Sequence, residues 1–110
     1  MSFSPIQNMW IEALRSGKYK QGRLFLRREG KYCCLGVAAD LLGSKDLLRS
    51  DLTDEEMTQL GLFTPTGGQK DRLSLAGLND IGHSFSDIAA LLETGVYFEQ
   101  DKSVETSQVP

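Results

Sequence analysis

The sequence is poor in the residues that build metal and redox sites, since its 110 residues include one histidine and two cysteines. Standard zinc sites need four Cys or His ligands, so we expect no metal and no cofactor. The two cysteines, Cys33 and Cys34, are neighbours in the chain. A disulfide between neighbours would be strained, because the bridge geometry prefers Cα atoms further apart than one peptide allows. Both are therefore expected to be free thiols.

Long apolar runs are also missing, and no run approaches the ~20 residues of a membrane-spanning helix. The first ten residues, MSFSPIQNMW, have no basic start followed by an apolar stretch, as a secretory signal would. These absences predict a cytoplasmic protein with no membrane partner. The length predicts one globular domain over residues 1–100, and the polar stretch 101–110 is predicted to be a flexible C-terminal tail.

Charge is distributed unevenly along the chain, although the net charge is only −3. Residues 1–32 contain seven basic and two acidic residues, which gives +5. Residues 33–110 contain five basic and thirteen acidic residues, which gives −8. Such an asymmetry gives a hint about partners and none about the fold.

Helical signals recur through the chain. Residues 4–17 have an N-cap serine, a proline at the first helical position, a terminal glycine and apolar residues spaced by three and four. A buried helix is predicted over residues 33–43 from its small and apolar residues. Capping signals predict further helices over residues 53–61 and 84–95, and a short helix is expected between residues 73 and 82.

The remaining signals describe a small β element. Residues 18–22 are predicted to form a loop, and residues 23–33 to form a two-stranded hairpin that turns at Glu29–Gly30. In this hairpin Leu24 and Leu26 would share one face of the first strand. The predicted fold class is therefore α+β and mostly helical, with about four or five short helices packed on a small antiparallel β-hairpin.

The segment RSGKYKQGR, residues 15–23, is the strongest candidate for a binding site. Lysine and arginine beside exposed glycine N–H groups suit an anion such as phosphate, and a tyrosine ring can stack on a base. We predict a site for an anionic, nucleotide-like ligand, although a solvated charged loop is the commoner interpretation of such a segment. The predicted site residues are Lys18, Lys20 and Arg23 for phosphate, Tyr19 or Tyr32 for stacking, and Gln21 and Asn79 for polar edges.

Two alternatives belong to other classes of protein. A cysteine-dependent enzyme would use Cys33 or Cys34 with His83 as the base, but free cysteines are more often buried as small hydrophobic residues. We therefore assign no catalytic residue. A nucleic-acid-binding accessory protein would use the basic segment. The helix at residues 84–95 has the rhythm of a DNA-reading motif, but the residues after it are acidic and would repel phosphate, so DNA is not expected as a partner.

Three blocks of the sequence form a longer pattern. They read W-I-E-A-L-R-S-G-K-Y-K-Q-G, Y-C-C-L-G-V and L-x-x-L-N-D-x-G-x-S-F, within Trp10–Arg27, Tyr32–Leu42 and Leu75–Glu93. The pattern resembles a family of small proteins of tailed bacteriophages and prophages. The resemblance brings no catalytic residue, but it implies a setting, because short phage proteins of this kind commonly antagonise antiviral defence of the host.

The leading hypothesis combines this setting with the basic segment. It is a phage-encoded, non-enzymatic binding protein of the host cytoplasm. Its partner would be a nucleotide-like small molecule, which it sequesters, or a host defence protein, which it blocks. Small ligand-binding proteins often build pockets between subunits, so a homo-oligomer is left open.

Overall fold

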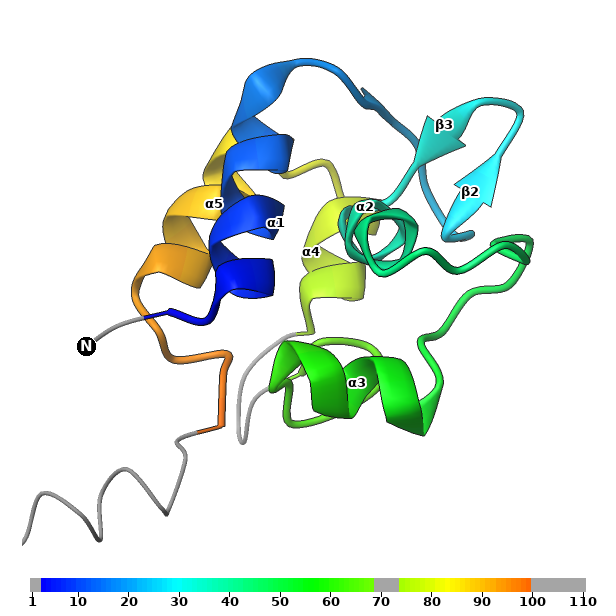
Figure 1. The fold of residues 1–110 in the computed structure, drawn as a ribbon. Coiled ribbons are helices and arrows are strands. Elements are labelled where there is room, and N and C mark those ends of the chain that lie inside the picture. The colour runs from blue at the N-terminus through cyan, green and yellow to red at the C-terminus, as the bar shows by residue number, and fades with distance from the viewer. Residues whose placement is uncertain (1–2, 69–73, 100–110) are drawn as a thin grey trace, which may run out of the picture.

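The computed structural model describes residues 3–68 and 74–99. Over these residues it contains five helices and a three-stranded sheet, which confirms the predicted α+β, mostly helical class. In chain order the elements are α1 (Pro5–Ser16), β1 (Lys20–Gln21), β2 (Arg27–Arg28), β3 (Lys31–Tyr32), α2 (Cys34–Leu41), α3 (Asp54–Leu60), α4 (Leu75–Asp80) and α5 (Phe85–Glu93) (Figure 1). None of these helices is long and apolar enough to cross a membrane.

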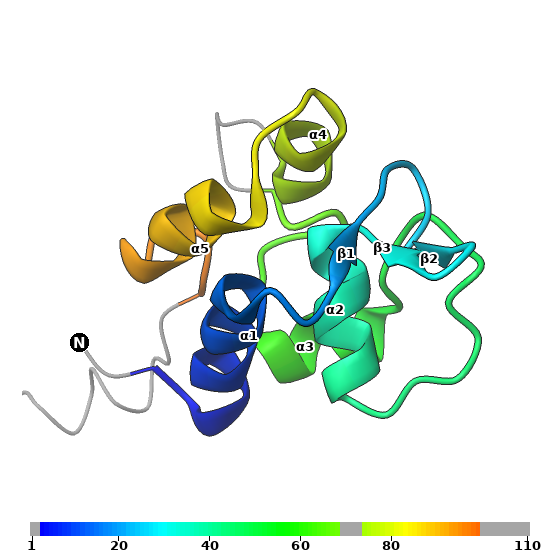
Figure 2. The same cartoon turned by 90° about the horizontal axis from the view of Figure 1, so that it is seen from above.

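The core lies between helices, and the sheet is at its side. α1 packs against α5 and α2, as the view from above shows (Figure 2). Trp10 of α1, Leu35 of α2 and Ile88 of α5 are fully buried there. The indole N–H of Trp10 donates to the carbonyl of Cys34 over 2.9 Å, which satisfies the one polar atom that this large side chain brings into the core.

The helix ends follow the predicted capping signals. Ser4 and Thr53 begin α1 and α3 with complete capping boxes, in which the partner side chains are Gln7 and Glu56. Ser84 accepts from the third backbone N–H of α5. Residue 73, the first of the helix expected over 73–82, lies outside the described residues, and the observed α4 begins at Leu75.

The predicted hairpin is only partly correct. β2 and β3 pair antiparallel around a turn in which Glu29 and Gly30 have φ values of 53° and 76°. The residues before β2 do not form a strand, because Leu24 has a φ of 73° and its N–H donates to the Asp80 carboxylate over 3.0 Å. Leu24 is exposed and Leu26 is fully buried, so the prediction that they share a strand face is wrong.

A third strand lies where a loop was predicted. β1 pairs parallel with β3, so the sheet has the order β1-β3-β2 and is mixed. The N–H of Gly22 continues this pairing by donating to the Tyr32 carbonyl over 2.6 Å. The parallel pairing joins residues on either side of the 22–26 loop. Local signals of residues 18–22 could not indicate it, because the partner strand comes later in the chain.

Close backbone contact positions the sheet against α2. A Cβ atom on Gly36 of α2 would lie 1.6 Å from the carbonyl oxygen of Leu26, so only glycine fits at this position. The same carbonyl accepts from the Cys33 N–H over 3.2 Å. The backbone around residue 26 is therefore fixed on the first turn of α2.

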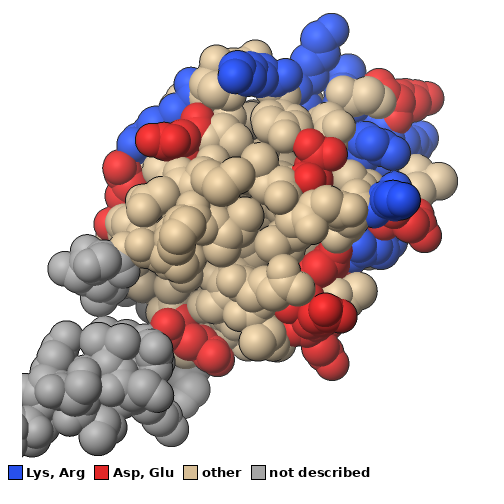
Figure 3. Space-filling model, in the orientation of Figure 1, with Lys and Arg blue, Asp and Glu red and all other residues tan. Residues whose placement is uncertain are grey.

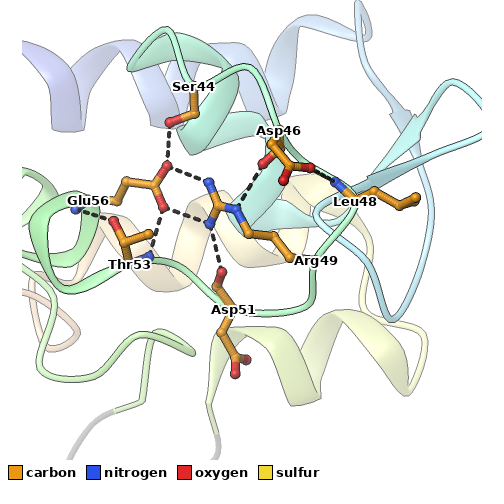
Figure 4. A network of polar contacts seen from close by, with 7 residues as sticks. All are labelled: Ser44, Asp46, Leu48, Arg49, Asp51, Thr53 and Glu56. Carbon is orange, nitrogen blue, oxygen red and sulfur yellow. Dashed lines mark hydrogen bonds and ion pairs between the residues drawn. The ribbon is translucent and has the colours of Figure 1, made fainter.

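The loop between α2 and α3 closes the other edge of the sheet. The N–H groups of Leu26 and Arg27 donate to the carbonyls of Arg49 and Leu47, over 2.7 and 2.9 Å. This loop is itself held by an ion pair, in which both terminal nitrogens of Arg49 donate to the two carboxylate oxygens of Glu56 at 2.8 Å (Figure 4). Paired N–H donors of this kind are the strongest arginine–carboxylate geometry.

Glu56 is the centre of this network. It is 6% exposed, and its carboxylate also accepts from the Ser44 hydroxyl and from the Thr53 N–H (Figure 4). These bonds, with that from Arg49 the largest, lower the pKa of Glu56 to about 2 although burial alone would raise it. Arg49 also donates to the carbonyls of Asp46 and Asp51. We call these interactions the Arg49–Glu56 network.

Candidate anion-binding face

The register of the sheet places three basic residues side by side. Lys20 of β1 lies opposite Lys31 of β3, which lies opposite Arg28 of β2. Residues directly opposite each other in neighbouring strands share a face, with Cβ atoms about 5 Å apart. All three are exposed. We call them the cationic row. Like charges in this arrangement destabilise a sheet, and an anion lying over the row would offset the repulsion.

None of these cations is neutralised by a described carboxylate. The ion pairs within residues 3–68 and 74–99 are Arg15–Glu93 and Arg49–Glu56, and neither involves the row. Residues 17–32 hold six basic residues and one acidic residue, Glu29. Lys and Arg gather over the sheet and the loop that follows α1 (Figure 3). The basic face, as we define it, consists of Lys18, Lys20, Arg23, Arg28 and Lys31.

A hollow of about 140 Å³ lies on the basic face between Arg23, Arg28 and Lys31. Gly22 lines it as well, and a Cβ atom there would come 2.8 Å from the Cβ of Lys31, so a larger residue would displace the lysine. Glu29 forms part of the rim and is unfavourable to an anion at that side. The hollow can receive a phosphate or carboxylate group, whereas pockets that enclose drug-sized ligands have roughly 300–1,000 Å³.

A second hollow, of about 150 Å³, adjoins the first. It is lined by Gln21, Gly22, Arg23, Asn79 and Gly82, so Gly22 and Arg23 belong to both hollows. Three predicted site residues, Gln21, Arg23 and Asn79, therefore meet at one place although the third is far from the others in sequence.

The side chain of Asn79 forms hydrogen bonds within the protein. It is 1% exposed, and its Oδ1 accepts from Gln21 Nε2 over 2.9 Å and from the Cys34 N–H over 3.2 Å. Its Nδ2 donates to the Gly22 carbonyl over 2.8 Å and to Asp80 over 3.4 Å. An amide has two donors and two acceptor positions, so all four are occupied. Asn79 therefore fastens β1 to α2 and α4 and has no free group for the polar edge of a ligand.

The side-chain N–H groups of Gln21 also form hydrogen bonds within the protein. Its Nε2 also donates to the carbonyl of His83 over 2.7 Å, so both of its N–H groups are bonded. Arg23 is exposed and is the residue that joins the two hollows. Of the three residues that meet here, Arg23 is the one with a charged group available to a partner.

The predicted stacking residues lie against each other. The rings of Tyr19 and Tyr32 have centroids 4.8 Å apart and meet edge to face at 85°. The Tyr19 hydroxyl donates to Asp40 over 2.7 Å, and burial together with this bond raises the pKa of Tyr19 to about 12. Neither tyrosine is among the lining residues of these two hollows, and nor is Lys18, which is exposed. The structure therefore does not bring these three residues to the hollows.

The cysteines are buried, as the more usual interpretation of free cysteines predicts. Cys33 is 3% exposed and Cys34 is fully buried, and burial raises the pKa of both thiols. The Cys34 thiol donates to the carbonyl of Leu75 over 3.4 Å. Neither thiol forms a hydrogen bond with His83 in the described part of the chain. A thiol is nucleophilic as the thiolate, so this environment does not favour catalysis.

The sequence-based prediction did not include Arg28 and Lys31 among the site residues. The charge count included both basic residues, but their position opposite Lys20 depends on the β1–β3 register. Since residues 18–22 were predicted to form a loop, that register was not available.

A family model described as "Domain of unknown function (DUF8296)" matches residues 3–60. The chain belongs to this family. The DUF8296 match includes α1, the whole sheet, α2 and the Arg49–Glu56 network, and it ends before α4. No curated protein and no solved structure matches the chain. The basic face thus lies within the family segment, whereas Asn79, which supports it from α4, lies beyond that segment.

Proposed function

We propose that this protein is a phage-encoded, non-enzymatic binding protein that antagonises host antiviral defence through its basic face. The cationic row carries the proposal. Three like charges, Lys20, Lys31 and Arg28, stand in neighbouring strands with no described ion pair. A fold gains nothing from this repulsion, so its use is in binding an anionic partner. The phage setting rests on the three sequence blocks given above.

Binding without chemistry is favoured by the state of the candidate nucleophiles. Both thiols are buried and their pKa values are raised, so few thiolates form near neutral pH. The side-chain amide of Asn79 and the N–H groups of Gln21 are occupied by hydrogen bonds within the protein. Apart from Glu29, the charged groups that line the hollows and face solvent are cations, which attract and hold anions.

The partner class favoured by the geometry is a host defence protein with an acidic surface. The two hollows adjoin but each is about the size of one anionic group, and neither Tyr19 nor Tyr32, whose rings pack on each other, is among their lining residues. A nucleotide would place its phosphates on the row and leave its base outside. It remains a second candidate because the hollow between Arg23, Arg28 and Lys31 fits a phosphate group.

A plating assay tests the proposed function. The protein is expressed in bacteria that each carry one antiviral defence system, and the plating efficiency of a restricted phage is measured. We expect the wild type to restore plating on at least one strain and Arg28→Glu or Lys31→Glu to lose this effect. Lys45→Glu, an exposed charge reversal outside the basic face, is the control. Equal restoration by the row variants and the control would contradict the proposal.

A thermal-shift panel tests the second candidate. Inorganic pyrophosphate, nucleoside triphosphates and cyclic dinucleotides are added to the purified protein. A ligand that binds the folded state raises the apparent Tm. A rise that Arg28→Glu abolishes and Lys45→Glu retains would favour the nucleotide over the protein partner. An unchanged Tm across the panel would remove the nucleotide candidate.

A further inference from the structure

Two large apolar side chains are exposed beside the basic face. Leu24 is 64% exposed and Ile81 is 68% exposed. Their positions are linked through Asp80, the residue that precedes Ile81, because its carboxylate accepts from the Leu24 N–H over 3.0 Å. We call these two residues the Leu24–Ile81 patch.

Leu24 is held in a conformation that a bulky side chain rarely adopts. Its φ of 73° lies in the left-handed region, where glycine is the residue without a steric penalty. Glycine would serve the turn as well, since the hydrogen bond to Asp80 uses only the backbone N–H of residue 24. The leucine side chain adds little to the core because most of it faces solvent. Its presence at a strained position suggests a use outside the fold.

The patch is continuous with the basic face through Arg23. This residue precedes Leu24 and lines both hollows. It also lies next to the residue after Ile81, because a Cβ atom on Gly82 would be 3.7 Å from Arg23 Nη2. The apolar residues are thus next to Arg23, and Arg23 lines the first hollow together with Arg28 and Lys31 of the cationic row.

We infer that the partner is a protein whose surface carries an apolar side chain flanked by carboxylates; this inference rests on the proposed function and names its partner class. The apolar side chain docks on the Leu24–Ile81 patch, and the carboxylates face Arg23 and the cationic row. Charge complementarity selects this occupant, since residues 17–32 hold six cations against one carboxylate. The core of a protein interface is apolar and enriched in arginine, whereas a phosphate gains nothing from an exposed leucine.

Fluorescence anisotropy with three short labelled peptides tests the inference. The first peptide has Glu and Asp around a central Leu-Phe pair. The second has Ser-Ser in place of Leu-Phe, and the third has Gln in place of every Glu and Asp. We expect the first peptide to bind about tenfold more tightly than either of the others, as loss of one good apolar contact or of the charge attraction would give.

Matched variants assign the binding to the patch. Leu24→Gly removes the side chain at a φ that glycine accepts, so the variant will fold. Leu24→Gly and Ile81→Ser should each lower the affinity for the first peptide to that of the second. Met9→Gln removes an exposed apolar residue on α1, 48% exposed, and should leave binding unchanged. Arg28→Glu should lower the affinity for both acidic peptides, the first and the second.

The outcomes separate this inference from the proposed function. Equal affinity for the first two peptides, or no effect of Leu24→Gly, would overturn the inference while leaving a purely electrostatic binding function intact. Light scattering of the protein alone adds one further outcome. A dimer that Leu24→Gly dissociates would assign the patch to a second copy of this chain and would also overturn the inference. If the row variants restored plating as well as the wild type did, or if the wild type restored none, the proposed function itself would be contradicted.

Discussion

The Arg49–Glu56 network lies beside the β2 edge of the sheet, whereas the cationic row crosses all three of its strands, and the charges in the two regions are balanced differently. In the network, each charge has an opposite partner, and the carboxylate is buried with every oxygen bonded. In the row, charges of one sign stand exposed with no described partner. Paired and buried charge fixes a loop, whereas unpaired and exposed charge remains available to another molecule.

The two regions are also mechanically linked. Arg49, whose side chain holds Glu56, accepts through its carbonyl from the N–H of Leu26, one residue before β2. The network therefore supports the strand that carries Arg28. Substitutions in the network should lower the free energy of unfolding. Substitutions in the row should change binding with little effect on the free energy of unfolding.

Glu56→Gln is expected to have the largest effect on stability. It replaces a carboxylate by an amide whose NH₂ group would face the Arg49 guanidinium, so the charge-assisted bonds are lost. Such bonds contribute about 1.5–3 kcal/mol each, and we expect the free energy of unfolding to fall by about 2 kcal/mol. Urea denaturation followed by circular dichroism measures it.

Glu55→Gln is the matched control on the same helix turn. Glu55 is exposed, so its replacement should change the free energy of unfolding by less than about 0.5 kcal/mol. If the two variants were equally stable, the contrast between buried and exposed charge at this edge would be wrong.

The stability contributed by the same network should depend on pH. The pKa of Glu56 is lowered to about 2 in the folded protein, from the 4.5 of a free glutamate. Folding therefore favours the ionised form, and its contribution is complete above pH 4.5 and is lost as the pH falls toward 2. Wild type should be more stable than Glu56→Gln at pH 7, and this difference should shrink by pH 3. A difference independent of pH would show that the charge of Glu56 is not what stabilises the loop.

Leu24→Gly should stabilise the protein, in contrast to most substitutions. Relief of the left-handed strain favours the variant by about 1–2 kcal/mol, and the greater freedom of glycine in the unfolded chain opposes it by about 0.5–1 kcal/mol. The difference is a gain in the free energy of unfolding of up to about 1.5 kcal/mol, centred on ~0.75 kcal/mol. Loss of stability would mean that the Leu24 side chain serves the fold, and the argument for a docking role would lose its basis.

Lys31→Gln should give the smallest effect. Lys31 is the middle residue of the cationic row, so its removal relieves repulsion with Lys20 and Arg28 together. We expect a gain of about 0.3 kcal/mol at low ionic strength, which should vanish in high salt because screening weakens the repulsion already. Lys45→Gln, outside the row, should show no such salt dependence in paired thermal melts. A loss of stability that persists in salt would contradict the account of the row.

The helices could be predicted because their signals are local. Ser4 and Thr53 cap helices that contain their own capping partners, and Gly17 and Gly61 end them with positive φ. The predicted burial of the cysteines was likewise supported by their apolar neighbours in sequence. Each of these inferences needed only residues within a few positions of each other.

The sheet and the site could be predicted only in part, because they depend on contacts between distant segments. The parallel pairing of β1 with β3 is set by how residue 26 packs on Gly36 and by the anchoring of Gly22 through Asn79. Asn79 and Gln21 were both predicted to bind the polar edge of a ligand, whereas in the structure their side chains are hydrogen-bonded to each other. No local signal distinguishes a ligand-binding asparagine from a structural one. The left-handed Leu24 could not be foreseen either, because leucine does not signal such a turn.

The central claim, that the exposed cations of the sheet bind an anionic partner, is tested most directly by nuclear magnetic resonance. The ¹⁵N-labelled protein is titrated with the acidic Leu-Phe peptide, and amide shifts are mapped along the chain. The account predicts the largest shifts at Gly22, Leu24 and Lys31, smaller shifts at Gly82, and none along α1 or α3. Shifts centred on α3, or no shifts at a peptide concentration that saturates the anisotropy signal, would contradict it.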